Sequence, residues 1–421
     1  WKNLSRFFLE NNINYNIVIL GGGQAAAHAA TTIRQEDESS SLAIITNENY
    51  LPYERPPLSK SFLLNKVKES DFLFYNEDHY KNLNIDILKN EEVINIDFEK
   101  KLLESKNKKI TYTKLLIATG CKNRTLDLEN VNSDDVYYLR DINESIQIKN
   151  KLDLAKNILI IGGGFIGLEI ASSANQLGKN VDVIELADSL MGRIVPKEIA
   201  TIVKNKHQKN GVNVHLNTKI ISTTKIDDGY EINLSDNSLV KCDMIIVGIG
   251  AMPNIDIFKD SPLKIDNGIL TDQNNKTSIE NVFAAGDVAN FFHPLYEENI
   301  RLESWKHAQN HGVAAGKNIT GIKTEYKEIP WMWSDQYDLN LQLTGRCDQY
   351  DSFIKRGKDE NEGIIYFFIK NNKIVGACGL GIGGKIGKDI RFAGMLSEKK
   401  VEIEEDFLSD PSSKLNKLLK K

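Results

Sequence analysis

Short apolar runs alternate with longer segments of helical spacing through the first three-quarters of the chain. The runs at 16–20, 42–46, 158–161 and 181–184 have the length and the apolar character of buried strands. The segments between them carry apolar residues at the spacing of one helix face. This alternation predicts parallel sheets with helices on both faces, which is the α/β class.

Two further apolar runs, Leu115–Gly120 and Met244–Gly250, end in glycine and bracket a second copy of the strand-and-helix pattern. A further apolar strand is expected at 282–285, after both of these runs. This is the arrangement of an inserted domain, in which the first sheet is left near Gly120 and entered again near Gly250. We therefore expect a first domain at 1–119, its continuation at 248–325, and an inserted domain at 120–247.

The pattern changes from about Glu325 onward. Apolar strands are expected at 364–369 and 373–378, with short turns and a charged helical tail. Such alternation predicts an antiparallel sheet flanked by helices. Residues 326–421 are therefore expected to form a C-terminal α+β domain.

Two glycine-rich turns, 141 positions apart, stand between a predicted strand and a predicted helix. The first comprises Gly21, Gly22, Gly23, Gln24, Ala25 and Ala26, and the second Gly162, Gly163, Gly164, Phe165, Ile166 and Gly167. Glycines there allow a tight bend and a close approach of a pyrophosphate, which rests on the helix N-terminus. The two turns predict two Rossmann-like dinucleotide-binding domains, and hence a flavoprotein that oxidises or reduces a nicotinamide. The alternative for each turn is a plain glycine-rich bend.

In a dinucleotide-binding unit, an acidic residue is expected at the end of the strand that follows the glycine turn. The two turns of this chain differ in that residue. Glu185 closes a strand 23 positions after Gly162, near the spacing at which a carboxylate reaches ribose hydroxyls. No cation lies beside Glu185 for a 2′-phosphate, so NADH is the expected nicotinamide. In the first copy the strand ends in Asn47 and Glu48, and either residue could hold the ribose.

Composition indicates a globular protein, with 421 residues, 41% apolar content, a formal charge of −5 and no long apolar run. These values favour neither nucleic acid nor a membrane as partner. The cysteines Cys121, Cys242, Cys347 and Cys378 form no CxxC pair, so we expect no metal site and a reducing, cytoplasmic location. Residues 1–15 are interpreted as a short extension without a signal-peptide core.

Three prolines stiffen the loop from Leu51 to Lys60. Pro56 and Pro57 suit the first turn of a helix, which would hold Lys60 on a rigid element. Such a loop can be purely structural. Its place after the second strand of the first dinucleotide unit favours a location beside the bound cofactor.

These residues together resemble the NADH-dependent ferredoxin and rubredoxin reductases that serve bacterial oxygenases. That family is part of the FAD-dependent pyridine nucleotide-disulfide oxidoreductases, with a glutathione-reductase-like fold and apoptosis-inducing factor as a more distant relative. The resemblance runs from Asn14 to the C-terminus. It rests on the Leu51–Lys60 loop, the second glycine turn through Glu169, and the segments at 284–287, 301–305 and 330–337.

The resemblance implies specific roles. Lys60 would lie near the flavin N5 and pair with Glu169, Arg55 would contact the FAD pyrophosphate, and Asp287 the ribityl chain. Glu185 would bind the adenosine ribose of NADH, and the tryptophan segment with Trp333 would cover the flavin edge. Further cofactor contacts are implied for Ala118, Thr119, Gly120, Arg193, Gly250, Gly286, Glu303, Ser304 and Trp305. Asn47 departs from the acid that is usual in the family.

The expected reaction is hydride transfer from NADH to FAD, followed by single-electron transfer to a ferredoxin or rubredoxin. Related disulfide reductases carry a redox cysteine pair early in the first domain, where this chain has Pro56, Pro57 and Lys60. The alternatives are reduction of a quinone or ascorbyl radical, and a non-enzymatic NADH-sensing flavoprotein. We expect a monomer or a weak homodimer.

Several residues outside the motifs carry weaker expectations. Trp305 and Trp331 could be core aromatics, His307 is expected to pack rather than catalyse, and Glu402–Asp406 is expected to be a solvated face. Gly379–Arg391 is expected to be an exposed loop that enters a helix. Candidate residues for docking an acidic ferredoxin are Lys306, Arg346, Lys385, Lys388 and Arg391.

Overall fold

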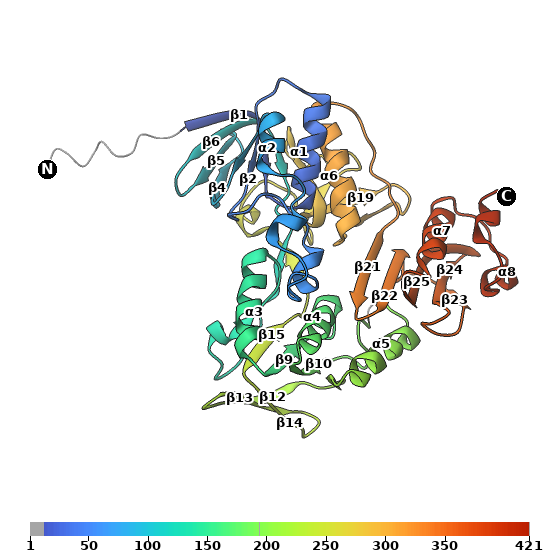
Figure 1. Cartoon of the computed structure of the whole chain (residues 1–421). Coiled ribbons are helices and arrows are strands. Elements are labelled where there is room, and N and C mark those ends of the chain that lie inside the picture. Colours follow the sequence, from blue (N-terminus) through green and yellow to red (C-terminus); the bar gives the residue numbers. More distant parts are fainter. Residues whose placement is uncertain (1–11, 193, 421) are drawn as a thin grey trace. The chain divides into compact units, whose positions relative to one another are not determined.

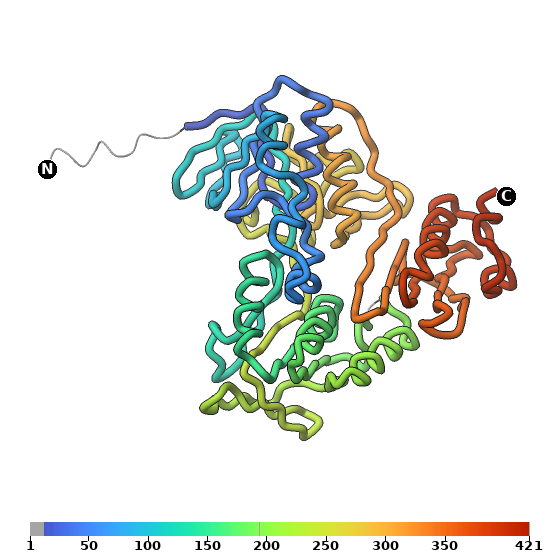
Figure 2. The backbone as a smooth tube through the Cα atoms, viewed as in Figure 1, coloured from blue at the N-terminus to red at the C-terminus, as the bar shows by residue number. Residues whose placement is uncertain are grey.

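The computed structural model describes residues 12–192 and 194–420, and the chain divides into two compact units. Unit 1 comprises 1–54, 70–122 and 252–328, and unit 2 comprises 55–69, 123–251 and 329–421. The tube in Figure 2 can be followed by colour through both units. The proline-stiffened segment after Glu54 thus belongs to unit 2. The finer division into FAD, NAD and C-terminal domains stays a prediction.

Unit 1 contains a seven-stranded sheet with the order β3-β2-β1-β6-β5-β4, and β18 pairs with β6. The strands β3, β2, β1, β6 and β18 are parallel, as expected. In contrast, β4, β5 and β6 pair antiparallel, because the hairpins between them are too short for crossovers. The bounds are β1 Asn12–Leu20, β2 Leu42–Ile45, β3 Ile85–Leu88, β4 Val93–Asp97, β5 Leu102–Ser105, β6 Lys109–Ile117 and β18 Val282–Ala284.

Helices α1 (Gln24–Glu36) and α6 (Trp305–Thr320) lie side by side in unit 1 (Figure 1). Buried alanines of α1 and Leu42, Ile44 and Leu116 of the sheet share one apolar core. A small sheet of β17, β19 and β20 completes the unit. The remaining bounds are α2 Glu77–Asn82, β7 Cys121–Asn123, β16 Ala251–Pro253, β17 Ile269–Thr271, β19 Ala289–His293 and β20 Glu298–Ile300.

Unit 2 contains a parallel sheet with the order β11-β10-β9-β15-β8 and an antiparallel three-stranded sheet of β12, β13 and β14. Leu168 and Ile170 of α4 pack against Ile158 and Ile160 of β9 in its core. The bounds are β8 Val136–Tyr137, α3 Ile142–Leu154, β9 Asn157–Ile161, α4 Phe165–Gln176, β10 Asn180–Ile184, α5 Lys197–Lys209, β11 Asn213–His215, β12 Ile220–Ile226, β13 Gly229–Leu234, β14 Leu239–Cys242 and β15 Met244–Val247.

The C-terminal part of unit 2 is an antiparallel sheet with the order β21-β22-β25-β24-β23, as its strand pattern predicts. The bounds are β21 Trp331–Gln336, β22 Leu339–Gly345, β23 Ser352–Arg356, β24 Ile364–Lys370, β25 Lys373–Ile382, α7 Gly387–Glu398 and α8 Glu405–Ser409. The prediction of an exposed loop at Gly379–Arg391 is wrong for residues 379–382, which belong to strand β25. Strand β25 continues to Ile382, because Gly379 and Gly381 pair with β22 on one side.

Within the part of the chain that the structure describes, we find no helix with the length and apolar character needed to span a membrane.

Candidate functional sites in the two units

The first glycine turn lies at the carboxyl edge of the unit 1 sheet. Leu20 of β1 is in register with Ile117 of β6, which is in register with Ala284 of β18. Gly21, Ala118 and Ala285 therefore begin the segments that leave one edge, and this is where parallel sheets bind ligands. Gly21 has a φ of +118°, and a Cβ there would lie 2.2 Å from the Ala118 carbonyl oxygen, so the bend requires glycine.

The beginning of α1 has the features of an anion-binding helix N-terminus. Gly23 is its N-cap without a capping side chain, and a Cβ there would meet no atom within 4 Å. The first N–H groups of a helix need partners from outside it. Both side-chain polar atoms of Gln24 are buried and have no hydrogen-bond partner in the described chain. Ala25 and Ala26 are buried in the core. A pyrophosphate group fits this arrangement.

The segments after β6 and β18 complete the same edge. Ala118, Thr119 and Gly120 follow β6, and the Thr119 hydroxyl donates to the Asn254 carbonyl oxygen at 2.9 Å. Gly286 and Asp287 follow β18. Sequence reasoning missed one supporting residue here: the Gly286 N–H donates to Nδ1 of His311 at 3.2 Å. Burial lowers the pKa of His311 well below its usual value, so the ring is neutral and can accept this bond.

The two residues considered for the FAD ribose follow β2, whose Ile45 pairs with Leu20. Asn47 is exposed, and Glu48 is half-buried and accepts a hydrogen bond from the Tyr53 hydroxyl. Which of the two binds the ribose stays a prediction.

The segment at the start of α6 holds three of the predicted contacts. Ser304 is the N-cap and accepts from the His307 N–H, Trp305 is half-buried, and Glu303 pairs with Arg301 at 2.6 Å. His307 is buried, stacks on Phe291 and hydrogen-bonds the Tyr326 hydroxyl at 3.0 Å. The expectation that His307 packs is confirmed.

The second glycine turn repeats this geometry in unit 2. Ile161 of β9 is in register with Ile184 of β10 and with Val247 of β15. Gly162 has a φ of +111°, and a Cβ there would lie 2.4 Å from the Gly248 carbonyl oxygen. Gly167 packs its backbone against Gly162. This part of the chain thus has the strand, turn and helix of a dinucleotide site.

Glu185 follows β10 and lies across the second turn. Its carboxylate accepts from the Gly163 N–H at 2.7 Å and from the Ala187 N–H at 2.8 Å. Gly164 is the N-cap of α4 without a capping side chain, and Phe165 and Ile166 form the first turn, with Ile166 exposed. Gly250 accepts from the Arg124 N–H. Arg193 lies outside the described residues.

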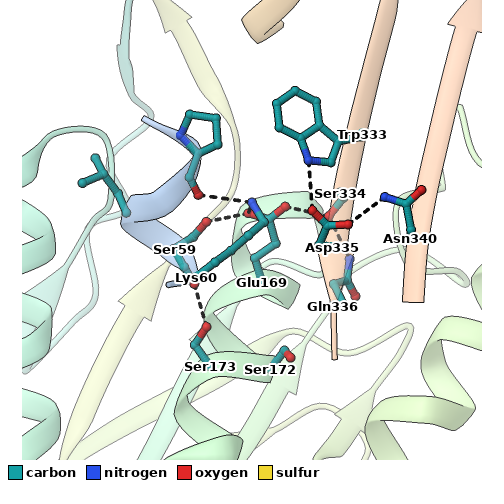
Figure 3. A network of polar contacts seen from close by, with 12 residues as sticks. Ser59, Lys60, Glu169, Ser172, Ser173, Trp333, Ser334, Asp335, Gln336 and Asn340 are labelled. Atoms are coloured by element: carbon teal, nitrogen blue, oxygen red, sulfur yellow. Dashed lines mark hydrogen bonds and ion pairs between the residues drawn. The ribbon is translucent and has the colours of Figure 1, made fainter. Parts of the chain in front are cut away.

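Lys60 and Glu169 form an ion pair, with 2.6 Å between Nζ and Oε2 (Figure 3). Pro56 and Pro57 begin a single 3₁₀ turn at Pro56–Ser59, and Lys60 follows it directly. Glu169 lies one turn into α4, and its side chain is 4% exposed against 22% for Lys60. A buried carboxylate requires such partners, because burying an unpaired charge is costly.

Three further residues of this network were not predicted. Ser59 and Ser334 both donate to the Glu169 carboxylate, at 2.5 and 2.7 Å. Gln336 donates to the Ser334 hydroxyl at 3.2 Å. Because side chains two positions apart share one face of a strand, the pattern of β21 could have identified Ser334 and Gln336 as a pair.

The other face of β21 carries Trp331, Trp333 and Asp335. The two indoles stack with centroids 5.2 Å apart, and the Trp333 indole N–H donates to Asp335 at 3.0 Å. Both rings are half-buried, so neither is a fully buried core aromatic. Arg55 donates to the Arg140 carbonyl oxygen, and its contact with FAD remains a prediction.

The folds and the two turns define an oxidoreductase class with two dinucleotide sites. Residues 15–312 match the family described as pyridine nucleotide-disulphide oxidoreductase, and residues 331–419 match the family described as reductase C-terminal. The chain belongs to the pyridine nucleotide-disulphide oxidoreductase family, which confirms the family resemblance and the fold class.

Two curated relatives are similar over most of their length. The 3-phenylpropionate/cinnamic acid dioxygenase ferredoxin–NAD(+) reductase component of Photorhabdus laumondii is 35% identical over 81% of this chain and 86% of its own. Rubredoxin–NAD(+) reductase of Ectopseudomonas oleovorans is 33% identical over 79% and 87%.

Two solved structures are similar to almost the whole of this chain. The ferredoxin reductase for the CYP199A2 system of Rhodopseudomonas palustris has a TM-score of 0.90 and 32% identity, and the match covers 96% of this chain and 99% of that one. The putidaredoxin reductase in a covalent complex with putidaredoxin has a TM-score of 0.90 and 25% identity, with 97% and 99% covered.

Proposed function

We propose that the protein is an FAD-dependent enzyme that oxidises NADH and reduces a small iron-sulfur protein, a ferredoxin or rubredoxin that serves an oxygenase. The observation that carries the proposal is the Lys60–Glu169 ion pair, held on a proline-stiffened turn and on the helix of the second dinucleotide turn. Membership in a family with reductases of this kind supports it.

FAD is assigned to the turn in unit 1. The N-terminus of α1 would bind its pyrophosphate, with Gln24 and the guanidinium of Arg55 as further donors. Glu48 or Asn47 would bind the adenosine ribose, and Asp287 the ribityl chain. We assign 1–119 and 248–325 to the FAD domain on this basis. The buried, unpartnered Gln24 side chain supports the assignment.

NADH is assigned to the turn in unit 2 and to an NAD domain at 120–247. The N-terminus of α4 would bind the pyrophosphate, and Glu185 would accept from two ribose hydroxyls. Gly250, Phe165, Ile166 and Arg193 are assigned as further contacts.

Lys60 and Glu169 are assigned to the hydride-transfer step. FAD, when bound, supplies a ring that accepts two electrons as a hydride and releases them singly. The Lys60 ammonium would stabilise the negative charge that this adds, and Glu169 would hold the ammonium in place.

The electrons would leave to a separate protein rather than to a thiol of this chain. All four cysteines are buried, and Pro56, Pro57 and Lys60 occupy the segment where related disulfide reductases carry a redox cysteine pair. Trp333 is assigned to the flavin edge and Trp305 to a further cofactor contact. The C-terminal domain is assigned to 326–421, and the four free thiols support a reducing, cytoplasmic location.

The test is stopped-flow reduction of the FAD-loaded protein by NADH, followed by mixing with a panel of ferredoxins and rubredoxin. We expect rapid bleaching of the flavin absorbance and rapid reoxidation by at least one iron-sulfur protein. A quinone or ascorbyl radical as the only fast acceptor would contradict the assigned partner. Slow bleaching with a long-lived charge-transfer band would contradict an enzymatic role altogether.

A further inference from the structure

A chain of buried polar side chains connects Glu169 with helix α5. Ser334 donates to Oε1 of Glu169 at 2.7 Å, Gln336 Nε2 donates to Ser334 Oγ at 3.2 Å, and Gln336 Oε1 lies 2.8 Å from His207 Nε2. All four residues are buried. Figure 3 shows the part that reaches Glu169.

The chemistry of each group fixes the direction of every bond. An ionised carboxylate only accepts, so the Ser334 hydroxyl donates to Glu169 and accepts from the Gln336 amide. The Gln336 carbonyl oxygen then faces His207 and can only accept. His207 must therefore carry its proton on Nε2, which leaves Nδ1 without a proton. Nδ1 is buried and has no hydrogen-bond partner in the described chain, and burial lowers the pKa of His207, so the ring is neutral.

The two carboxylate oxygens of Glu169 are therefore held by different parts of the molecule. Oε2 receives Lys60 and Ser59, and Oε1 receives Ser334. Rotation of the carboxylate about its last bond would break contacts at both oxygens. In a buried site each lost partner costs the desolvation of the group left behind.

We propose that Ser334, Gln336 and His207 are positioning residues, a relay of donors that orients the Glu169 carboxylate toward the Lys60 ammonium. The inference rests on the proposed function, in which this ion pair serves hydride transfer. It assigns a role in that step to the C-terminal segment and to α5, neither of which carries a glycine turn.

A second contact between the same elements supplies the control. The Tyr337 hydroxyl donates to Asn175 of α4 at 3.1 Å, and the Tyr337 ring lies edge-on to His207 with centroids 5.1 Å apart. Tyr337→Phe removes one hydrogen bond between the end of β21 and α4 but keeps the ring contact and the relay. It reports on general loosening.

The test measures the rate at which a lysine-specific reagent acylates Lys60. The reagent is added to the full FAD-loaded protein, and mass spectrometry follows the labelling of Lys60. An ammonium held by an oriented carboxylate reacts slowly. Gln336→Met removes the two hydrogen bonds that Gln336 makes in the relay at similar side-chain length, and His207→Phe removes the terminal donor. We expect both to raise the acylation rate of Lys60, by about fivefold for one neutral hydrogen bond. His207→Gln keeps a donor at the Nε2 position, so it and Tyr337→Phe should label at the parental rate.

Parental labelling in Gln336→Met and His207→Phe would overturn the proposal. Faster labelling in Tyr337→Phe would overturn the proposal too, because general loosening would then explain the effect. Labelling of His207→Gln as fast as that of His207→Phe would also overturn it. The same variants are then reduced with NADH, where Gln336→Met should be slower by a similar factor. If Gln336→Met is labelled faster but is reduced by NADH at the parental rate, the relay has no role in hydride transfer. If the parental protein is not reduced by NADH, the proposed function fails, and the labelling still shows whether the relay holds Lys60.

Discussion

The Glu185 carboxylate accepts a hydrogen bond from the Gly163 N–H at 2.7 Å. The acid is thus fixed across the second glycine turn, at the place where the ribose of a nicotinamide cofactor is bound in such turns. A 2′-phosphate at this place would meet a negative charge.

We therefore expect NADH to be preferred over NADPH by at least tenfold in kcat/KM, which corresponds to about 1.4 kcal/mol. Glu185→Gln should reduce this preference because it removes the charge. Asp188→Asn is the control, since Asp188 pairs with Lys197 instead. Equal use of both cofactors by the parental enzyme would contradict the assignment of Glu185.

Lys60→Ala should slow flavin reduction by NADH by roughly 10- to 100-fold, on the order of the loss of one well-placed charge in an active site. Ser59 and Ser334 still donate to Glu169 in this variant. Single-turnover bleaching of the flavin absorbance measures the effect.

Lys66→Ala is the matched control, because Lys66 is exposed on the same segment. Hydride transfer at the parental rate in Lys60→Ala would make Lys60 a structural anchor only. The flavin content of each preparation is measured first, so that loss of FAD is recognised.

Charge reversal at Lys385 and Lys388 should slow ferredoxin reduction, most clearly at low salt. Lys385 is exposed after β25, and Lys388 and Arg391 are exposed on α7. Exposed charges act over about 8 Å at physiological ionic strength, so added salt should remove the difference. Arg346 is held by Asp348 at 2.9 Å and is a weaker candidate than Lys306, which is exposed in unit 1.

The control reverses Lys399 and Lys400, which are exposed at the other end of α7 and give the same change in net charge. Reduction of ferricyanide by NADH should be equal in both variants. Equal ferredoxin kinetics at low salt would locate the acceptor surface elsewhere.

Stability should fall in mild acid because of the buried histidines of unit 1. Burial lowers the pKa of His307 to about 3 and that of His311 well below its usual value of 6.5. The unfolded chain binds protons below about pH 6.5 and the folded one does not, so the stability present above that pH is lost as pH falls toward 3.

Each histidine contributes a slope of up to about 1.4 kcal/mol per pH unit. Urea unfolding at pH 7.5, 6 and 5 measures the slope, and the variant with His307→Gln and His311→Gln should show a smaller one. The same slope in both proteins would refute the assignment.

Arg356 should hold the C-terminal segment in place. It is 5% exposed, pairs with Asp389 at 3.1 Å, and donates to the carbonyl oxygens of Leu408, Asp410, Pro411 and Ser413. Arg356→Met leaves these acceptors and Asp389 without their donor, and a buried acceptor left without its partner costs about 1–3 kcal/mol. Faster proteolysis within 404–420 is the expected result.

Lys355→Met is the neighbouring control, because Lys355 forms an exposed pair with Glu198, worth about 0–1 kcal/mol. Equal cleavage rates in the two variants would show that the segment is held by its apolar contacts alone.

The sequence by itself determined the parts of this protein that depend on local backbone chemistry. Gly21 and Gly162 occupy conformations that only glycine adopts easily, and each is preceded by an apolar strand. The spacing located Glu185 at the end of the strand after the second turn, and its role at the ribose stays a prediction. Pro56 and Pro57 predicted the start of a helix before Lys60, which the structure has as a single 3₁₀ turn. These signals are short-range, so they can be read without the fold.

Only the tertiary structure decided which distant side chains meet. Ser59 and Ser334 are far apart in the chain, and both reach Glu169 because the turn at Pro56–Ser59 and strand β21 contact α4. His207 joins them only through Gln336. Similarly, the extension of β25 to Ile382 follows from pairing with β22, which made a glycine-rich stretch part of a strand. Hydrogen bonds between distant elements leave no periodic pattern in the sequence, because each requires only one suitable residue at each end.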